Sequence, residues 1–328
     1  MDLLVIDNLD ADVMAWLASR HSVRHAPELA IGPREFRRAL YNVRAAIIPS
    51  SVSVDTETLD FAPVLRAIGR VSGGSENIDL VACERRHVEV VRSVTASARA
   101  EAEFVIGAML ALLRRVPVRN ADGSLVGREL SGTTIGLVGM PPAARTIARL
   151  LAAFNTRIVG YDPSVHASDG VWATWGVAPA GLREIVERAD VLCVQLDYFS
   201  RYHGLLGDRF LPYCKPDQVL VSTSHSALFD EVSLAAALKS GRIAAAWLDS
   251  MAPGALDPER PLHGIDTLQV TPRIASTTRE SRQRRAWAVA RRIDELLGVQ
   301  ALGPRAGSDF SPTTPGVPSD LEADSLSR

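Results

Sequence analysis

Short apolar runs alternate with amphipathic segments over most of the chain. Apolar runs at residues 3–6, 45–48 and 65–70 predict β-strands, because they are short and mostly apolar. Between them, residues 10–19 and 33–40 have the character of helices. This alternation predicts a small α/β unit at the start of the chain.

The same alternation continues after a long helical stretch. Residues 97–115 are apolar at nearly every inner position of a long helix, which suits a hinge and a dimer-packing element, and residues 120–128 are expected to form a polar loop. A parallel sheet wrapped by helices is predicted beyond it. Its predicted strands are 134–138, 157–160, 171–177, 191–196, 218–222, 244–249 and 267–271, and helices are expected at 181–188 and 231–240. A last helix, 279–297, is expected to pack back on the first unit.

The segment from residue 133 to residue 163 has the pattern of a nucleotide-binding unit. A strand leads to Gly139, a helix follows, and a second strand ends at Asp162, 23 positions after that glycine (162 − 139). In a dinucleotide fold this turn reads G-x-G-x-x-G, and the acid binds the ribose diol. Here Pro141 and Ala144 stand where the second and third glycines are expected.

Two adjacent prolines change what this turn can offer to a phosphate group. Pro141 brings side-chain bulk near the diphosphate, and Pro142 has no backbone N–H to donate. Both changes weaken a phosphate cradle. The alternative interpretation is that the two prolines simply start a helix, because proline is tolerated in the first turn.

Composition and charge describe an ordinary globular protein. The length of 328 residues predicts two domains, and a net charge of −2 gives no bias toward nucleic acid or membrane. Cys83, Cys193 and Cys214 are isolated, which predicts reduced thiols in a cytoplasmic protein, and no metal-ligand spacing is present. Residues 300–328 are rich in Pro, Ser, Gly and acids and are predicted to form a disordered tail.

Several separate motifs occur in one register and together carry a family resemblance. They include GRVSGGSENIDL, GRELSGTTIGLVG, ADVLCVQL, AAWLDSMAP and LQVTPRIASTTRESR. Over about residues 1–298 the chain resembles the D-isomer-specific 2-hydroxyacid dehydrogenases. The resemblance implies a doubly wound, Rossmann-type dinucleotide domain (98–278) inserted into a smaller flavodoxin-like α/β domain (1–97 with 279–299).

The resemblance implies a nicotinamide enzyme in which an arginine holds the substrate, a histidine donates a proton and a glutamate orients that histidine. This chain has His225 where the family has the arginine, Ala252 where it has the glutamate, and Arg273 where it has the histidine. The expected cofactor-contacting residues are Gly139, Pro141, Ala143, Ala144, Asp162 and Asp249, and the expected substrate-side residues are Gly73 and Gly74.

Two functional hypotheses follow from these changes. The first is a family member with a degenerate active site, without 2-oxo acid reduction, that retains NAD(H) binding and has a binding or regulatory role. The alternative is an NAD-dependent oxidoreductase on a 2-hydroxy or 2-oxo acid, with a rebuilt site in which Arg273 clamps a carboxylate and His225 acts as general acid. In both cases we expect a homodimer that packs through residues 98–115.

Overall fold

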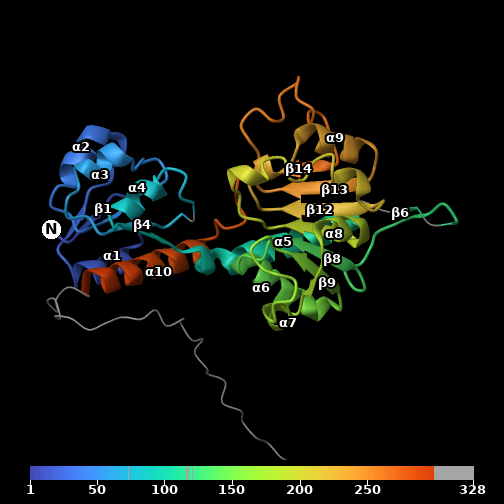
Figure 1. The fold of residues 1–328 in the computed structure, drawn as a ribbon, viewed down its shortest axis with the longest axis horizontal. Coiled ribbons are helices and arrows are strands. Elements are labelled where there is room, and N and C mark those ends of the chain that lie inside the picture. The colour runs from blue at the N-terminus through green and yellow to red at the C-terminus, as the bar shows by residue number, and fades with distance from the viewer. Residues whose placement is uncertain (73, 116–117, 120, 299–328) are drawn as a thin grey trace, which may run out of the picture.

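The chain folds around two parallel sheets that lie side by side, each covered by helices (Figure 1). The computed structural model describes residues 1–72, 74–115, 118–119 and 121–298. The predicted tail, 300–328, and the predicted substrate-side residue Gly73 lie outside the described residues. Within the described part of the chain, no helix is long and apolar enough to cross a membrane.

The five-stranded unit comprises the first sheet with its helices. Its strand order is β2-β1-β3-β4-β5, and every pairing is parallel, which is the flavodoxin-like order. The elements are β1 (Leu3–Val5), α1 (Ala11–Ala18), β2 (Val23–His25), α2 (Pro33–Ala39), β3 (Ala45–Ile47), α3 (Thr56–Asp60), β4 (Ala67–Arg70), α4 (Leu80–Arg85) and β5 (Glu89–Arg92), with the 3₁₀ helix η1 (Pro27–Ile31). Alternate strand residues face two separate apolar clusters, one on each side of the sheet.

The seven-stranded unit carries the second sheet. Its order, β10-β9-β8-β11-β12-β13-β14, is the doubly wound order that reverses at β8. Its strands are β8 (Thr134–Val138), β9 (Arg157–Tyr161), β10 (Ala178–Pro179), β11 (Val191–Val194), β12 (Gln218–Ser222), β13 (Ile243–Leu248) and β14 (Leu268–Val270). Its helices are α6 (Pro142–Leu151), α7 (Val171–Trp175), α8 (Leu182–Arg188) and α9 (Glu231–Lys239), with 3₁₀ helices η2 (Ala152–Phe154), η3 (Ser200–Tyr202), η4 (Leu211–Tyr213) and η5 (Ser226–Leu228). The predicted fold class is confirmed.

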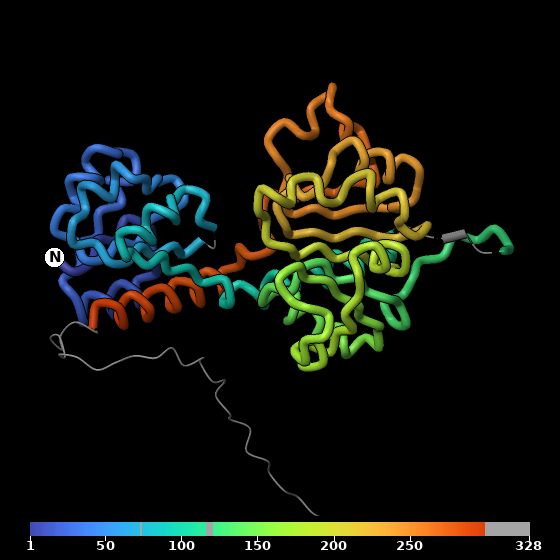
Figure 2. The backbone as a smooth tube through the Cα atoms, viewed as in Figure 1, coloured from blue at the N-terminus to red at the C-terminus, as the bar shows by residue number. Residues whose placement is uncertain are grey.

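Two long helices connect the units. The tube in Figure 2 shows α5 (Val94–Arg115) and α10 (Arg279–Gly298) running alongside each other between them. As predicted, α10 packs back on the first sheet, where Val289 and Ile293 are fully buried. Helix α5 packs against α6 and β12 within the chain, and the homodimer through it stays a prediction.

The structure adds elements that the sequence did not predict, namely β2, α3, α4, β5 and β10, and it contradicts the prediction at two further places. Residues 171–177 were expected to form a strand because of their β-branched and aromatic residues, but they form α7, followed by Gly176 with a positive φ of 65°. Burial of Trp172 and its Nε1–H donation to the His166 carbonyl (2.9 Å) hold this turn. The predicted polar loop contains strand β7 (Leu125–Val126), which pairs antiparallel with β6 (Val118–Arg119).

Candidate functional site

The turn after β8 requires a glycine. Gly139 has a φ of 91°, and a Cβ atom built on it would lie 2.5 Å from the Leu196 Cα atom. Because that neighbour is backbone of the loop after β11, no side-chain movement could relieve the contact. The glycine therefore sets the approach of two strand ends at the point where the sheet order reverses.

Helix α6 starts with few backbone donors. Pro141 is its N-cap residue and Pro142 its first residue, and neither has an N–H. The first N–H groups of the helix belong to Ala143 and Ala144, both of which are buried. The helix terminus therefore offers an anion fewer hydrogen bonds than a glycine-rich turn would.

Asp162 stands directly after β9, beside that turn. Its Oδ2 accepts a hydrogen bond from the Met140 backbone N–H (2.7 Å), and its Oδ1 accepts from the Ser164 backbone N–H (2.8 Å) and hydroxyl. These bonds fix the carboxylate at the strand end. An acid at this place binds the ribose diol of NAD and repels the 2′-phosphate of NADP. Asp162 therefore fits the ribose of an NAD cofactor, whereas the start of α6 offers the cofactor diphosphate fewer hydrogen bonds than a glycine-rich turn would.

His225 follows β12, and one hydrogen bond and one stacking contact position its ring. Its Nδ1 accepts the Ala227 backbone N–H (3.1 Å), so the ring proton lies on Nε2. The ring stacks on Tyr198, with centroids 4.7 Å apart and planes 23° apart. Although His225 is largely exposed, the partial burial of its ring, followed by the positive charge of Arg273, lowers the pKa of the imidazole.

Arg273 lies in the loop after β14, in an unusual backbone conformation. Its φ is 57°, and its N–H donates to the Asp249 carbonyl (2.7 Å). The guanidinium Nε donates to Ser250 Oγ (3.3 Å), and Nη1 lies 3.7 Å from a carboxylate oxygen of Glu76. The side chain is 61 % exposed, so it can still bind a ligand. Among the described residues, His87, Asn155 and Asp217 are the other non-glycine residues at positive φ, so the conformation of Arg273 is a feature of its loop and does not by itself indicate a site.

Arg273 and Glu76 both act electrostatically on the His225 ring. Arg273 lowers the pKa of His225, and Glu76 raises it. Glu76 belongs to the five-stranded unit, on the loop that also carries Gly74. A Cβ atom on Gly74 would lie 2.1 Å from a Glu76 carboxylate oxygen, so the glycine leaves room for that carboxylate. Phe199 is 52 % exposed, and its ring lies against Tyr202, with ring centroids 6.0 Å apart.

Asp249 holds the loop that carries Arg273. It is buried, and its Oδ1 accepts the Thr271 hydroxyl (2.6 Å) and the Ile274 N–H (2.9 Å). Its Oδ2 accepts the Ala275 N–H (2.8 Å). These three bonds give the side chain a positioning role in the loop.

An open cavity of about 430 Å³ lies beside His225. Ala252, at the position where the sequence comparison expects a glutamate, lines the same cavity. The other side chains lining it include His203, Asp230 and Glu231. The position of the missing carboxylate is therefore open space next to the imidazole.

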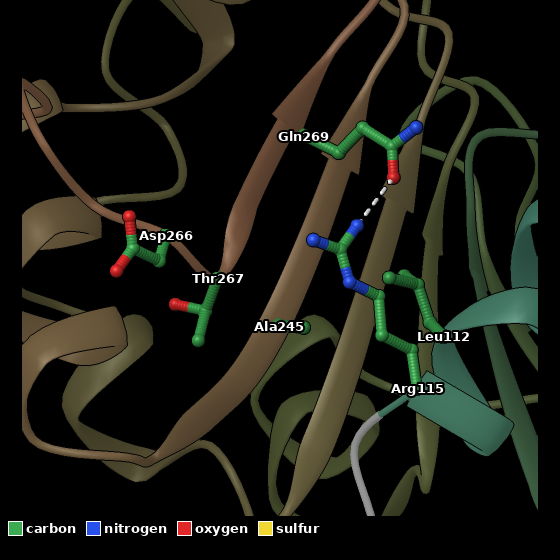
Figure 3. Close-up of a pocket in the computed structure, with 6 residues that line it drawn as sticks. All are labelled: Leu112, Arg115, Ala245, Asp266, Thr267 and Gln269. Atoms are coloured by element: carbon green, nitrogen blue, oxygen red, sulfur yellow. Dashed lines mark hydrogen bonds between the residues drawn. The ribbon is translucent and has the colours of Figure 1, made fainter.

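A second, smaller cavity of about 80 Å³ lies at the opposite ends of the strands. Figure 3 shows it between the last turn of α5 and strands β13 and β14, with Arg115 donating to the Gln269 side-chain oxygen (3.2 Å). It is too small for a dinucleotide, so the carboxyl-end cleft is the candidate site.

The cysteines offer no nucleophile to this site. All three are free and buried, and burial raises the pKa of the thiols to about 11 for Cys83 and about 12 for Cys193 and Cys214. Thiols with such pKa values stay protonated near neutral pH. Among the described residues, no group of three or more His, Cys, Asp and Glu side chains could hold a metal ion.

Two side chains that contact His225 and Arg273 were not predicted from the sequence. Tyr198 stacks on the imidazole, and Glu76 faces the guanidinium. A signal for Glu76 was present, because it follows Gly74 by two positions in the substrate-side loop. The Tyr198 contact depends on how two loops meet, and no spacing in the sequence indicates it.

Known proteins resemble this chain in sequence over nearly its full length. It is 30 % identical over 308 residues to a (S)-sulfolactate dehydrogenase of Chromohalobacter salexigens, covering 92 % of this chain and 99 % of that protein. It is also 30 % identical over 301 residues to a D-3-phosphoglycerate dehydrogenase of Mycobacterium tuberculosis, covering 89 % of this chain and 56 % of that longer protein.

Solved structures share the fold. An acyclic imino acid reductase in complex with NADPH and D-Arg superposes with a TM-score of 0.77 at 20 % identity, covering 92 % of this chain and 98 % of that one. A glyoxylate reductase from Paecilomyes thermophila gives a TM-score of 0.77 at 22 % identity, with coverages of 90 % and 95 %. Residues 106–275 match the family described as D-isomer specific 2-hydroxyacid dehydrogenase, NAD binding domain, and the chain belongs to that family.

Proposed function

We propose that this chain binds NAD(H) and a small carboxylate-bearing molecule in the cleft without performing the family's 2-oxo acid reduction. The observation that carries the proposal is the state of His225. Its Nδ1 is already a hydrogen-bond acceptor, and its pKa is lowered by burial and by Arg273. The imidazolium that a general acid requires is therefore disfavoured near neutral pH.

The missing carboxylate supports the same conclusion. A carboxylate beside an imidazole favours its charged form and fixes its orientation. Ala252 supplies no such group, and the cavity that it shares with His225 is open. Glu76 is the acid that raises the pKa of His225, but it faces Arg273. The proton donor of the reaction therefore lacks support.

Binding has better support than chemistry. The exposed guanidinium of Arg273 can clamp a carboxylate with two parallel hydrogen bonds. Asp162 favours NAD(H) over NADP(H). A bound nicotinamide would supply a hydride to a neighbouring carbonyl group. The proton donor to that carbonyl is the part that this chain does not support.

The test combines a titration with an activity screen. We expect NADH to quench tryptophan fluorescence with micromolar affinity and NADPH to bind more weakly. We expect no NADH oxidation with 2-oxo acids, including glyoxylate and the 2-oxo acids that correspond to the sulfolactate and phosphoglycerate of the relatives' names. Turnover on the order of 1 per second or more would overturn the proposal.

A second candidate function is an oxidoreductase in which His225 and Arg273 exchange roles. It is favoured by one observation, that Arg273 lies close enough to His225 to lower the pKa of the imidazole. In that case His225→Ala abolishes turnover and leaves NADH binding intact. An active wild type whose rate is unchanged by His225→Ala would reject this candidate.

A further inference from the structure

Two arginines stand side by side where β4 and β5 end. Arg70 and Arg92 are register partners in these parallel strands, so their side chains start from the same face of the sheet. Arg70 is 2 % exposed and Arg92 is exposed. Neither guanidinium lies within 4.0 Å of a carboxylate of the described residues. Like charges on neighbouring strands repel, and burial together with the positive charge of Arg92 lowers the pKa of Arg70, whereas the carboxylates of Glu76 and Asp7 raise it.

The two arginines orient two serine hydroxyls. Arg70 donates to Ser72 Oγ through Nε (3.2 Å) and Nη2 (2.9 Å), and Arg92 donates to Ser75 Oγ through Nη1 (3.3 Å). Each serine oxygen therefore accepts from a guanidinium. Because a hydroxyl also carries one donor, each O–H is free to donate to another group.

One further donor has no acceptor. The Nη1 atom of Arg70 is buried, and no described residue accepts a hydrogen bond from it. A buried charged donor without a partner is costly. Together with both hydroxyls and the remaining N–H groups of Arg92, it makes a cluster in which donors outnumber acceptors. Such a cluster is complementary to an oxyanion.

This cluster borders the cleft between the two units. Ser72 and Ser75 lie on the same loop as Glu76, which faces Arg273 across the cleft. Arg92 acts on Asp197 of the seven-stranded unit, whose pKa is raised by burial and lowered by Arg92. The negative charges nearby are Asp7 and Glu76, which act on Arg70, and Asp197, which Arg92 acts on. The hydrogen-bond donors of this cluster therefore belong to the five-stranded unit, whereas Arg273 belongs to the seven-stranded unit.

We propose that Ser72, Ser75 and Arg92, supported by Arg70, form a subsite for an anionic group of the molecule bound in the cleft. The group is a carboxylate, a sulfonate or a phosphate, whose oxygens share the chemistry that this cluster recognises. The inference rests on the proposed function, in which the cleft takes a small anionic molecule. With Arg273 on the other side, the bound molecule carries two anionic groups.

The experiment measures binding of small anions to the full chain by calorimetry. The probes are inorganic phosphate, methanesulfonate and acetate, which separate the three sources of an oxyanion. We expect at least one probe to bind, and Arg92→Gln to weaken it by about tenfold or more. Ser72→Ala and Ser75→Ala are each expected to weaken it by a few-fold. The matched control is Arg66→Gln, an exposed arginine just before β4, which should leave the affinity unchanged.

The outcomes that would overturn the subsite are specific. They are the absence of binding for all three probes, and an affinity that Arg92→Gln and Ser75→Ala leave unchanged. Because Arg92→Gln could disturb the fold, thermal unfolding of each variant is measured, and the serine variants test the same claim with a smaller change. Asp197→Asn removes a nearby negative charge and is expected to tighten binding; weaker binding would contradict the placement.

Failure of the subsite and failure of the proposed function are distinguishable. NADH binding depends on Asp162, at the end of β9 in the other unit, and is titrated without any added anion. NADH binding without anion binding rejects the subsite alone. Anion binding that Arg92→Gln removes, in a protein that does not bind NADH, supports the subsite and rejects the proposed NAD(H) site.

Discussion

The two ends of the cleft differ in how closely their residues follow the pattern of the family. At the ribose end, Asp162 is present and its carboxylate is fixed by Met140 and Ser164. At the reaction end, His225, Ala252 and Arg273 stand where the family resemblance places an arginine, a glutamate and a histidine, and the Nδ1 atom of His225 accepts a backbone N–H. Both ends are built on the carboxyl ends of strands in one sheet, so the fold supports either. The comparison shows that the ribose end and the reaction end are built on separate loops of one scaffold, so that residues at one end can differ without a change at the other.

The largest effect is expected from removing the turn on which the ribose end depends. Gly139→Ala places a Cβ atom against the Leu196 backbone at a positive φ, so the free energy of unfolding should fall by about 3 kcal/mol. Urea denaturation measures it. Gly181→Ala is the control, since a Cβ atom there meets nothing within 4 Å, and its effect should stay within about 0.5 kcal/mol. Equal effects in both variants would contradict the role of the turn.

The next effect concerns the cofactor directly. Asp162→Asn removes the negative charge from the ribose site, so NADH affinity should fall about tenfold while NADPH affinity falls less. Fluorescence titration measures both. Asp169→Asn is a matched control, because Asp169 also accepts a backbone N–H (Val171, 2.9 Å) in an exposed turn. If Asp162→Asn left the NADH affinity unchanged, Asp162 would have no role in binding the cofactor ribose.

The reaction end can be partly restored. Ala252→Glu places a carboxylate in the cavity beside His225, so the pKa of the imidazole should rise from its lowered value. NMR titration of the histidine ring measures it, with the neutral Ala252→Gln as control. The same shift in both variants would show that charge is not the cause.

The smallest effect is a dependence of stability on pH. Because the pKa of His225 is lowered in the folded state, the unfolded state binds the proton more tightly, and stability falls as the pH drops through and below the ordinary histidine pKa. His225→Asn should reduce this loss. The effect is small because the side chain is exposed. Unfolding curves between pH 5 and 8, a window set by the range in which histidine titrates, measure the difference; identical pH profiles of wild type and variant would contradict it.

The sequence predicted buried strands better than short exposed elements. Strands β8 and β12 begin and end at the predicted residues. A strand that is buried on both faces of a parallel sheet appears in the sequence as a short continuous apolar run, so its ends can be predicted. The turn at 171–175 was predicted wrongly, because its local β preference is overridden by the burial of Trp172 against the second sheet's helices.

The candidate site shows the same division. The residue types at 139, 141, 162, 225, 252 and 273 can be read from the sequence, and they already indicate a changed site. Two contacts could not be predicted from the sequence. They are the hydrogen bond from the Ala227 N–H to His225 Nδ1 and the contact between Arg273 and Glu76. Both depend on where loops from different strands meet, which side-chain packing and the placement of the two units determine.

The most direct test of the central claim is a single-turnover experiment with the protein in excess over NADH. Bound NADH fluorescence is followed after a 2-oxo acid is added, so that every cofactor molecule is held in the cleft when substrate arrives. The account predicts that NADH binds and that its signal persists unchanged. Loss of the NADH signal within seconds to minutes, with formation of the 2-hydroxy acid, would contradict it.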